Sequence, residues 1–354
     1  MFERRAPEQH DSLPEIPEPA ENPILVGHEN ACSMLAGAYR AGKLHHALLF
    51  AGRQGIGKAT LAFHLAHHLF VNPDHRSAPD MPFRIDTDSQ AFRLVAQGAH
   101  PGLLHLTRPF VERDKKFKTV ITVDEIRRVS RFLSLTPPDG GYRVVIVDPA
   151  DDMNINAANA LLKNLEEPPP RTIFILIAHS LGRLLPTIRS RCQVYKLDPL
   201  SPELLEGLLE SLGVSLPESA EERRLLVERA GGSARDAILL TEFGGLEIEQ
   251  VIGQILGQRR FDVAQAYKLA EAATGRERQV QFDLFNRAML DRVADAASRA
   301  ASGGAVTEAE RLAVLWEELA DIIRQVEIFN LDRKQHVVMC LNRLHQAMHV
   351  PVMG

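Results

Sequence analysis

The chain has 354 residues, of which 45% are hydrophobic and 25% are charged, and its formal net charge is -5 at pH 7. This length exceeds what one hydrophobic core usually organises, so two or three domains are expected in an ordinary soluble globular protein. The small negative charge excludes the strongly basic surface of a protein that binds nucleic acid by itself.

Residues 1–21 carry several prolines among acidic side chains and are predicted to form a disordered tail. This start is neither basic nor apolar, so it lacks the form of a signal peptide, and no run approaches the ~18 apolar residues of a membrane span. The cysteines Cys32, Cys192 and Cys340 are widely scattered, which excludes a disulfide framework and a four-cysteine zinc module. We therefore expect a cytoplasmic protein with no membrane contact.

Residues 22–198 alternate short β-branched runs with helical patterns, which predicts an α/β domain with a mainly parallel sheet. The predicted strands are residues 47–51, 103–106, 144–148, 173–178 and 193–196. The predicted helices are residues 29–40, 58–70, 123–134 and 154–166.

A glycine-rich segment between the first strand and the next helix has the form of a phosphate-binding loop. Gly52, Gly55 and Gly57 would let backbone N–H groups curl around phosphates, and Lys58 would reach the outer phosphates. The alternative is a coincidental glycine turn, which the strand before it and the helix after it speak against.

The residue after the lysine departs from the usual pattern. A Ser or Thr hydroxyl normally binds magnesium there, whereas this chain has Ala59. Thr60 is no simple substitute, because one step along a helix turns a side chain by roughly 100°. The loop is therefore predicted to hold a nucleotide without cleaving it.

A second departure follows the strand at residues 144–148. Asp148 has the place of a metal-directed carboxylate, although it could simply close a core strand. The next position, where a water-activating acid would stand, is Pro149. A general base contributes roughly 10²–10⁴-fold to a rate, so its loss together with the metal ligand predicts negligible turnover.

Beyond Pro199 the strand signals end and the chain is predicted to be helical throughout. Two terminal helices have apolar stripes at three- and four-residue steps, and Thr307 and Glu310 have the spacing of a capping box. The stripes are Phe282, Phe285, Met289 and Val293, and Leu312, Leu315, Leu319, Ile322 and Val326. Such stripes usually form a core, and one face could instead pack against helices of neighbouring subunits.

Several motifs together resemble the clamp-loader branch of the AAA+ proteins. They are the run Asn156–Pro169, the Ser190-Arg191-Cys192 triplet, His46-Ala47 before the phosphate loop, the segment 98–103 and Ile126-Arg127. The resemblance covers nearly the whole chain past residue 22. It implies an α/β plus all-α fold: a P-loop AAA+ module at 22–198, a helical lid at 199–248, and a helical collar at 249–354 for oligomerisation.

The triplet supplies the candidate catalytic residue. By resemblance, Arg191 is an arginine finger given in trans to a neighbouring ATPase, an effect worth roughly 10³–10⁵ in rate in related hydrolases. Arg189 is the nearby alternative, and a surface arginine paired with a carboxylate is the plain structural interpretation.

The lid carries a further candidate, because residues 231–236 resemble a motif whose arginine senses bound nucleotide. Arg235 would then touch a phosphate, unless it merely belongs to a helix-capping turn. The predicted degenerate nucleotide site comprises Gly52, Gly55, Gly57, Lys58, Thr60, Asp148 and Arg235. It predicts weak or structural binding of ATP or ADP.

No zinc is predicted, although many relatives carry a four-cysteine zinc module after the loop helix, because residues 71–98 contain no cysteine. His64, His67 and His68 have helix-facing spacing that could chelate a metal. Without another ligand in view, packed or solvated histidines are the preferred interpretation.

The resemblance implies a non-hydrolysing scaffold subunit of a clamp loader in the bacterial DNA polymerase III holoenzyme, at the cytoplasmic replisome. Its partners would be motor subunits, a clamp-opening subunit, the sliding clamp, and primed DNA through the assembled complex. A motor subunit that hydrolyses ATP is one alternative, which Ala59 and Pro149 oppose. An independent AAA+ DNA-repair ATPase is another, which the absence of a basic surface and of an intact site opposes.

Overall fold

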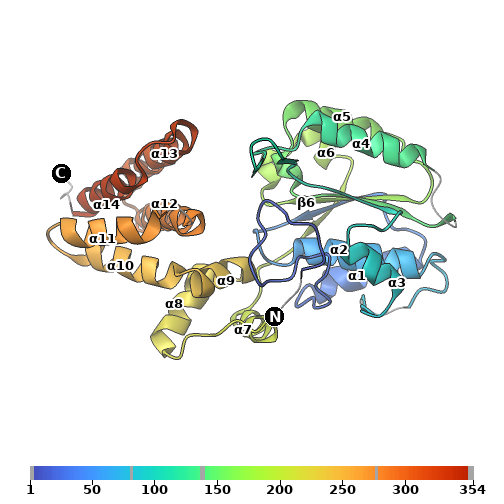
Figure 1. Cartoon of the computed structure of the whole chain (residues 1–354), viewed down its shortest axis with the longest axis horizontal. Coiled ribbons are helices and arrows are strands. Elements are labelled where there is room, and N and C mark those ends of the chain that lie inside the picture. Colours follow the sequence, from blue (N-terminus) through green and yellow to red (C-terminus); the bar gives the residue numbers. More distant parts are fainter. Residues whose placement is uncertain (1–3, 80–82, 136–139, 276–277, 350–354) are drawn as a thin grey trace. The chain divides into compact units, whose positions relative to one another are not determined.

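The computed structural model describes residues 4–79, 83–135, 140–275 and 278–349. The chain forms two compact units (Figure 1). The first unit comprises residues 1–212 and 231–235, and the second comprises residues 213–230 and 236–354. Within the described ranges, no helix combines the length and the apolar character needed to cross a bilayer.

The first unit is built on a five-stranded parallel sheet. Its strands are β2 (Leu103–Leu106), β5 (Arg143–Val147), β6 (Thr172–Ala178), β1 (Ala47–Ala51) and β7 (Gln193–Lys196), in that spatial order. The three central strands are buried along their whole length, as expected for apolar runs covered on both faces. The five predicted strands are confirmed within one residue at each end.

Helices cover both faces of this sheet (Figure 1). Leu48 and Phe50 of β1 pack on the side of α1 (Glu29–Arg40) and α2 (Lys58–Val71), whereas Ala47 and Leu49 pack on the side of α4 (Val123–Ser134) and α5 (Ile155–Glu166). This division follows from the alternation of side chains along a strand. The predicted helices are confirmed, and so is the α/β character of this unit.

Shorter elements complete the first unit. They are α3 (Gln90–Ala96), η2 (Ala150–Asp152), η3 (Leu181–Arg183), α6 (Pro186–Arg189), α7 (Pro202–Ser211) and the antiparallel hairpin β3 (Phe110–Val111) and β4 (Lys116–Phe117). The hairpin was not predicted, because two-residue strands of mixed polarity carry no readable period.

Residues 4–21, the described part of the disordered tail predicted for residues 1–21, are packed; residues 1–3 lie outside the described residues. Ala6 and Leu13 are buried, and the Glu21 carboxylate accepts hydrogen bonds from the backbone N–H groups of Arg5 (2.8 Å) and Glu18 (3.0 Å). The composition rule failed because this segment does not build a core of its own. It packs on the first unit instead.

The second unit is entirely helical among its described residues. Its helices are α8 (Ala220–Ala230), most of α9 (Ala234–Glu242), α10 (Gly245–Gly257), α11 (Val263–Ala273), α12 (Gln279–Ser302), α13 (Val306–Phe329) and α14 (Arg333–His349). The predicted all-α part of the fold is confirmed.

The apolar stripes of the terminal helices form the core of the second unit. Phe282, Phe285, Met289 and Val293 on α12 are at most 1% exposed, and Leu312, Leu319 and Val326 on α13 are buried too. The predicted capping box is wrong: α13 begins one residue before Thr307, and its N-cap, Ala305, provides no side-chain hydrogen bond.

The division into compact units does not coincide with the predicted domain boundaries. The first unit continues through α7 and includes residues 231–235, both of which were assigned to the lid at 199–248. The reason is local: the N–H of Leu200 donates to the Gly232 carbonyl at 3.0 Å, and the N–H of Ala234 to the Gly55 carbonyl at 3.0 Å. The separate lid and collar roles stay predictions.

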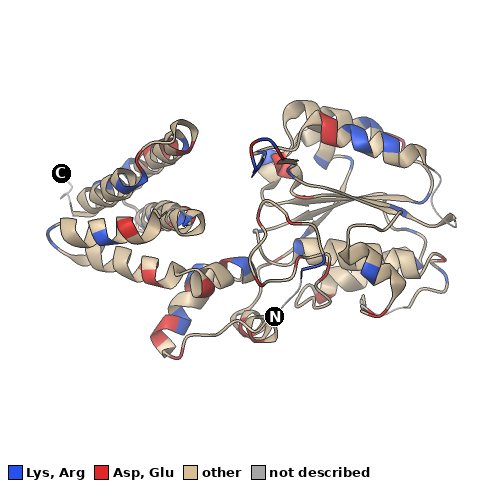
Figure 2. Ribbon diagram, viewed as in Figure 1, with Lys and Arg blue, Asp and Glu red and all other residues tan. Residues whose placement is uncertain are grey.

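Basic and acidic side chains are interspersed over the described parts of both units (Figure 2). On α4, for example, Arg127 pairs with Asp124 at 2.6 Å and Arg128 pairs with Glu125 at 2.5 Å. Pairing one turn apart on a helix reduces the net field that such arginines present to solvent.

Candidate functional site

The phosphate-loop sequence forms a loop between β1 and α2. Gly55 and Gly57 have φ angles of +78° and +99°, in the region that favours glycine. A Cβ at Gly55 would also collide with Ser233 and with Arg235, which approach the loop from the segment 231–235. The strand, loop and helix context expected for a phosphate site is therefore present, and a coincidental turn is a poorer description.

Lys58 is buried and bonded to its own loop. Its Nζ donates to the carbonyl oxygens of Gly52 at 2.7 Å and Arg53 at 2.5 Å. Burial lowers the pKa of Lys58 to about 8, and the carboxylates of Asp148 and Asp151 oppose that shift. The lysine is thus satisfied by backbone oxygens, and a phosphate would have to replace these bonds.

The residues after Lys58 provide no evident magnesium ligand. The methyl group of Ala59 packs against the core beneath α1 and α2, and Thr60 is buried on α2. A methyl group cannot coordinate a cation, so Ala59 provides no magnesium ligand in the folded chain.

Asp148 lies where β5 ends, at the same edge of the sheet as the loop. Burial raises the pKa of Asp148 to about 7, with neighbouring carboxylates adding to the shift and Lys58 opposing it. Its backbone N–H continues the sheet by donating to the Leu106 carbonyl at 2.9 Å. Both interpretations of Asp148, a metal-directed carboxylate and the end of a core strand, fit this position.

The acids beyond Pro149 are engaged in holding the structure. Asp151 is buried and accepts the backbone N–H groups of His179 (3.0 Å) and Ser180 (3.1 Å). Asp152 is buried and accepts the Arg108 Nε–H at 2.6 Å. Neither carboxylate is placed as a free base for activating water.

His179 is a site residue that the sequence interpretation missed. It directly follows β6, so it lies at the edge that carries the phosphate loop. Burial and then the Lys58 charge lower the pKa of His179 to about 4, so the imidazole is neutral near pH 7. The available signal was its place after an apolar strand, because ligands of open parallel sheets bind at the carboxyl ends of the strands.

Arg235 is also near the phosphate loop, as predicted. The neighbouring Ala234 N–H bonds the Gly55 carbonyl, which fixes this segment on the loop. The Arg235 guanidinium donates to the carbonyl of Asp11, and its Nη1 lies 3.7 Å from the Asp11 carboxylate. The arginine is thus already paired with an anionic group of its own chain.

The structure therefore brings together all seven residues of the predicted nucleotide site on one strand–loop–helix unit and its neighbours. In this arrangement, however, they do not leave the cations available to phosphates. Lys58 is bonded to the loop and Arg235 to the N-terminal segment.

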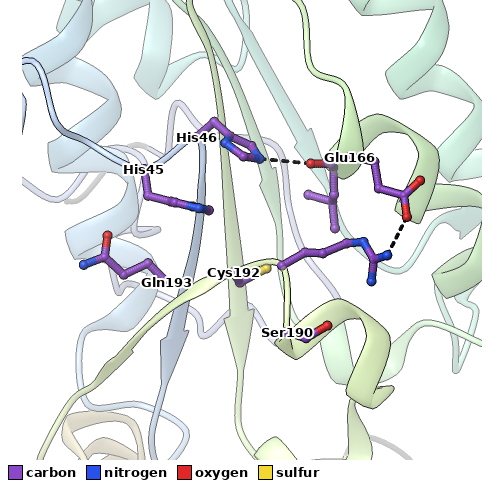
Figure 3. Close-up of a pocket in the computed structure, with 8 residues that line it drawn as sticks. His45, His46, Glu166, Ser190, Cys192 and Gln193 are labelled. Atoms are coloured by element: carbon purple, nitrogen blue, oxygen red, sulfur yellow. Dashed lines mark hydrogen bonds and ion pairs between the residues drawn. The ribbon is translucent and has the colours of Figure 1, made fainter.

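A second candidate site surrounds Arg191 (Figure 3). It is a surface pocket of about 530 Å³ lined by His45, His46, Leu165, Glu166 and residues 190–193. His46 Nε2 contacts the Leu165 carbonyl at 2.9 Å, and the rings of His45 and His46 stack with centroids 4.5 Å apart. The two stacked imidazole rings thus form part of the pocket wall beside Arg191.

Arg191 is held at the pocket by two contacts. Its Nη2 lies 2.7 Å from Glu166 Oε1, and its Nη1 donates to the Thr187 carbonyl at 2.9 Å. The side chain remains 36% exposed. A surface arginine paired with a carboxylate, the plain structural interpretation, describes its state in this chain.

Arg189 is exposed and its guanidinium turns toward η3, where Nη1 contacts the Leu181 carbonyl at 3.4 Å. Cys192 packs against the core on the side of α4 and α5, and burial raises the pKa of its thiol to about 12. Of Arg189, Arg191 and Cys192, only Arg191 is a cation that lines the pocket.

The two sites lie at opposite edges of one sheet. The loop, Asp148 and His179 follow the carboxyl ends of β1, β5 and β6, whereas Arg191 precedes β7, whose first residue pairs with Leu48 at the start of β1. The five residues of β1 rise about 3.3 Å each, so about 16 Å of strand separates the two edges. Arg191 cannot reach the phosphate loop of its own chain.

Residues 27–201 match the family model described as DNA polymerase III, delta subunit. Over this segment, which is just under half of its length, the chain is similar to that family. The matched residues contain the phosphate loop, Asp148, His179 and the whole pocket around Arg191, whereas Arg235 lies beyond them.

Individual relatives agree with this similarity. The delta' subunit of DNA polymerase III from Pseudomonas aeruginosa is 37% identical over 225 residues, which cover 63% of this chain and 60% of that protein. The delta' subunit from Escherichia coli K12 is 35% identical over 167 residues, which cover 47% and 46%. The gamma subunit from Buchnera aphidicola subsp. Schizaphis graminum is 32% identical over 222 residues, which cover 62% and 56%.

The chain thus spans about three fifths or less of the length of these relatives. The resemblance to clamp-loader subunits of DNA polymerase III, which the sequence motifs predicted, is confirmed, and the similar proteins include delta' subunits. Among solved structures, a Thermotoga maritima protein related to the gamma subunit of DNA polymerase III shares 16% identity with a TM-score of 0.40 over 91% of this chain and 100% of that chain. Values this low add nothing on function.

The histidines of α2 that had the spacing of a chelate belong to the core. His64 Nε2 contacts the Asn22 carbonyl at 2.9 Å, His67 Nε2 contacts Ser89 Oγ at 3.1 Å, and the His68 ring packs on Tyr39 and Phe83. Over the described residues, no group of three or more His, Cys, Asp or Glu side chains could hold a metal ion. The absence of zinc stays a prediction.

Proposed function

We propose that this chain is the delta-prime, or scaffold, subunit of the clamp loader of DNA polymerase III. In this role it donates Arg191 in trans to a neighbouring ATPase subunit and does not hydrolyse ATP itself. The observation that carries the proposal is the position of Arg191: it is a partly exposed cation at the sheet edge opposite its own phosphate loop. A cation placed there can act only on a phosphate held by another molecule.

The state of the chain's own phosphate site supports the second half of the proposal. Ala59 cannot hold magnesium, and the carboxylates that follow Pro149 are bonded to backbone and to arginine. A metal contributes several kcal/mol of charge stabilisation and a general base roughly 10²–10⁴-fold. Without them, the chain supports neither the motor-subunit alternative nor an independent ATPase.

Partners follow from the same role. We infer that the chain assembles with the motor and clamp-opening subunits in the cytoplasm, and that the complex as a whole meets the sliding clamp and primed DNA. The mixed charges of the described surface support contact with DNA through the assembly rather than through this chain alone (Figure 2).

The test is reconstitution of the loader with purified partner subunits. Arg191→Ala is expected to lower DNA-stimulated hydrolysis at the site that faces this subunit by about 10³-fold or more. Arg189→Ala is the matched control, because it removes an arginine two residues earlier, at the end of α6, whose guanidinium faces η3 instead of the pocket. Gel filtration establishes that both variants assemble.

Unchanged hydrolysis and clamp loading with Arg191→Ala would refute the trans role. Magnesium-dependent phosphate release by the purified chain alone would refute the scaffold role and favour the motor alternative.

A further inference from the structure

The N-terminal segment forms a closed loop, which we call the N-terminal loop (residues 4–21). The Glu21 carboxylate joins the two ends by accepting the N–H groups of Arg5 and Ala6 at 2.8 and 3.3 Å. Inside the loop, Arg4 donates to the Leu13 carbonyl and Ser12 donates to Glu18. Close ends and internal packing are the properties of a compact Ω-loop.

The tip of this loop lies at the phosphate site. Gln54, within the phosphate loop, donates from Nε2 to Asp11 Oδ2 at 3.3 Å. Arg235 bonds the Asp11 carbonyl and lies 3.7 Å from its carboxylate. The neighbouring Gln9 accepts the Thr107 hydroxyl at 2.6 Å, just after β2. Three separate parts of the carboxyl-edge site thus contact residues 9–11.

The electrostatics place the Asp11 charge among the same groups. After burial, Asp11 is the largest contributor to the raised pKa of Asp148. Asp11 also opposes the burial and the Lys58 charge that lower the pKa of His179. The carboxylate is therefore close to the strand-end residues that would face the phosphates of a nucleotide.

The chemistry of the phosphate site explains why the Asp11 carboxylate is favoured there. Glycine-rich loops and a nearby arginine favour an anion, and Asp11 provides one without any ligand. Because the loop is part of the same chain, its effective concentration at the site is in the millimolar range or above. A free nucleotide has to compete with it.

We propose that the N-terminal loop occupies the chain's own nucleotide site, with Asp11 taking the place of a phosphate, and that nucleotide binds only when this loop leaves. This inference concerns the phosphate edge and does not rest on the trans role of Arg191. It assigns a competing ligand, an internal carboxylate, to a site whose affinity for nucleotide then depends on how often the loop is open.

The test compares ADP binding to the full-length chain by fluorescence titration with a labelled ADP. Asp11→Asn removes the charge that holds the loop closed. If the closed state outnumbers the open state by at least about 10 to 1 in the unchanged chain, opening the loop should tighten ADP binding by at least about 10-fold. Glu8→Gln is the matched control, an exposed carboxylate of the same loop, and should leave the affinity unchanged. Adding Lys58→Ala to Asp11→Asn should abolish the gain.

A second measurement reports on the loop itself. Hydrogen exchange of residues 4–21 in the unchanged protein should accelerate when ADP is added at saturating concentration. Equal ADP affinity for Asp11→Asn and the unchanged chain, or exchange in residues 4–21 that ADP leaves unaltered or slows, would overturn the proposal. Arg191→Ala should affect neither measurement, so a failure here is distinguishable from a failure of the trans role.

Discussion

Lowering the pH should destabilise the second unit through His336. This side chain on α14 is 2% exposed, its Nε2 contacts Asn286 Oδ1 at 2.8 Å, and burial lowers its pKa from 6.5 to about 4. The folded-state pKa is depressed, so the unfolded chain binds the proton first as the pH falls. Stability from the neutral imidazole is therefore full above about pH 7 and is lost progressively toward pH 4.

The magnitude follows from the two pKa values. Between pH 7.5 and pH 5.0 the unfolded state gains about 2 kcal/mol from protonating one histidine of ordinary pKa, whereas the folded state gains almost nothing. With a urea slope of roughly 1–3 kcal/mol per molar, this loss moves the unfolding midpoint by about 1 M.

Urea denaturation followed by tryptophan fluorescence is the appropriate assay. The chain has one tryptophan, Trp316, and it lies on α13 of the second unit, so the signal reports on the unit that contains His336. His336→Gln should lose about 2 kcal/mol less than the unchanged protein between the two pH values. His349→Gln removes an exposed imidazole of the same helix for comparison. Parallel pH profiles for His336→Gln and the unchanged chain would refute the reasoning.

Two further predictions concern the arginine pocket and the helical core. Glu166→Gln removes a solvent-exposed ion pair, so it should change the stability of the chain by less than about 1 kcal/mol and raise partner ATP hydrolysis by no more than about 5-fold. Both effects are measurable in the reconstituted loader. A loss of hydrolysis would instead assign Glu166 a positioning role. Phe285→Ala should cost about 3–5 kcal/mol in the same urea assay, since the ring is fully buried on α12, while Ile328→Ala at an exposed position should cost little; equal losses would contradict the assigned core.

The sheet and its covering helices could be predicted because their signals are local. The runs that became β1 and β6 are continuous and apolar, which is what burial on both faces requires. The phosphate loop could be predicted for the same reason, because a backbone that needs positive φ angles favours glycine.

The site residues that could not be predicted from the sequence depend on contacts between residues far apart in the chain. Asp11 forms hydrogen bonds with Gln54 and Arg235, and no sequence pattern within the N-terminal loop predicts either partner. His179 becomes a site residue only because the sheet places the end of β6 beside β1. Composition correctly indicated that the N-terminal loop has no core of its own, but it could not show that another surface would receive it.

The separation of the two edges also bears on order within an assembly. If subunits follow one another head to tail, each phosphate edge faces the arginine edge of the next molecule, and such contacts are heterologous. A member whose phosphate edge has lost its chemistry gains nothing from an arginine there, yet its other edge still serves a neighbour. In the proposed role, such a chain would serve at one terminus of an open row and not in its interior, and the opposite placement of the two edges would give that row a direction.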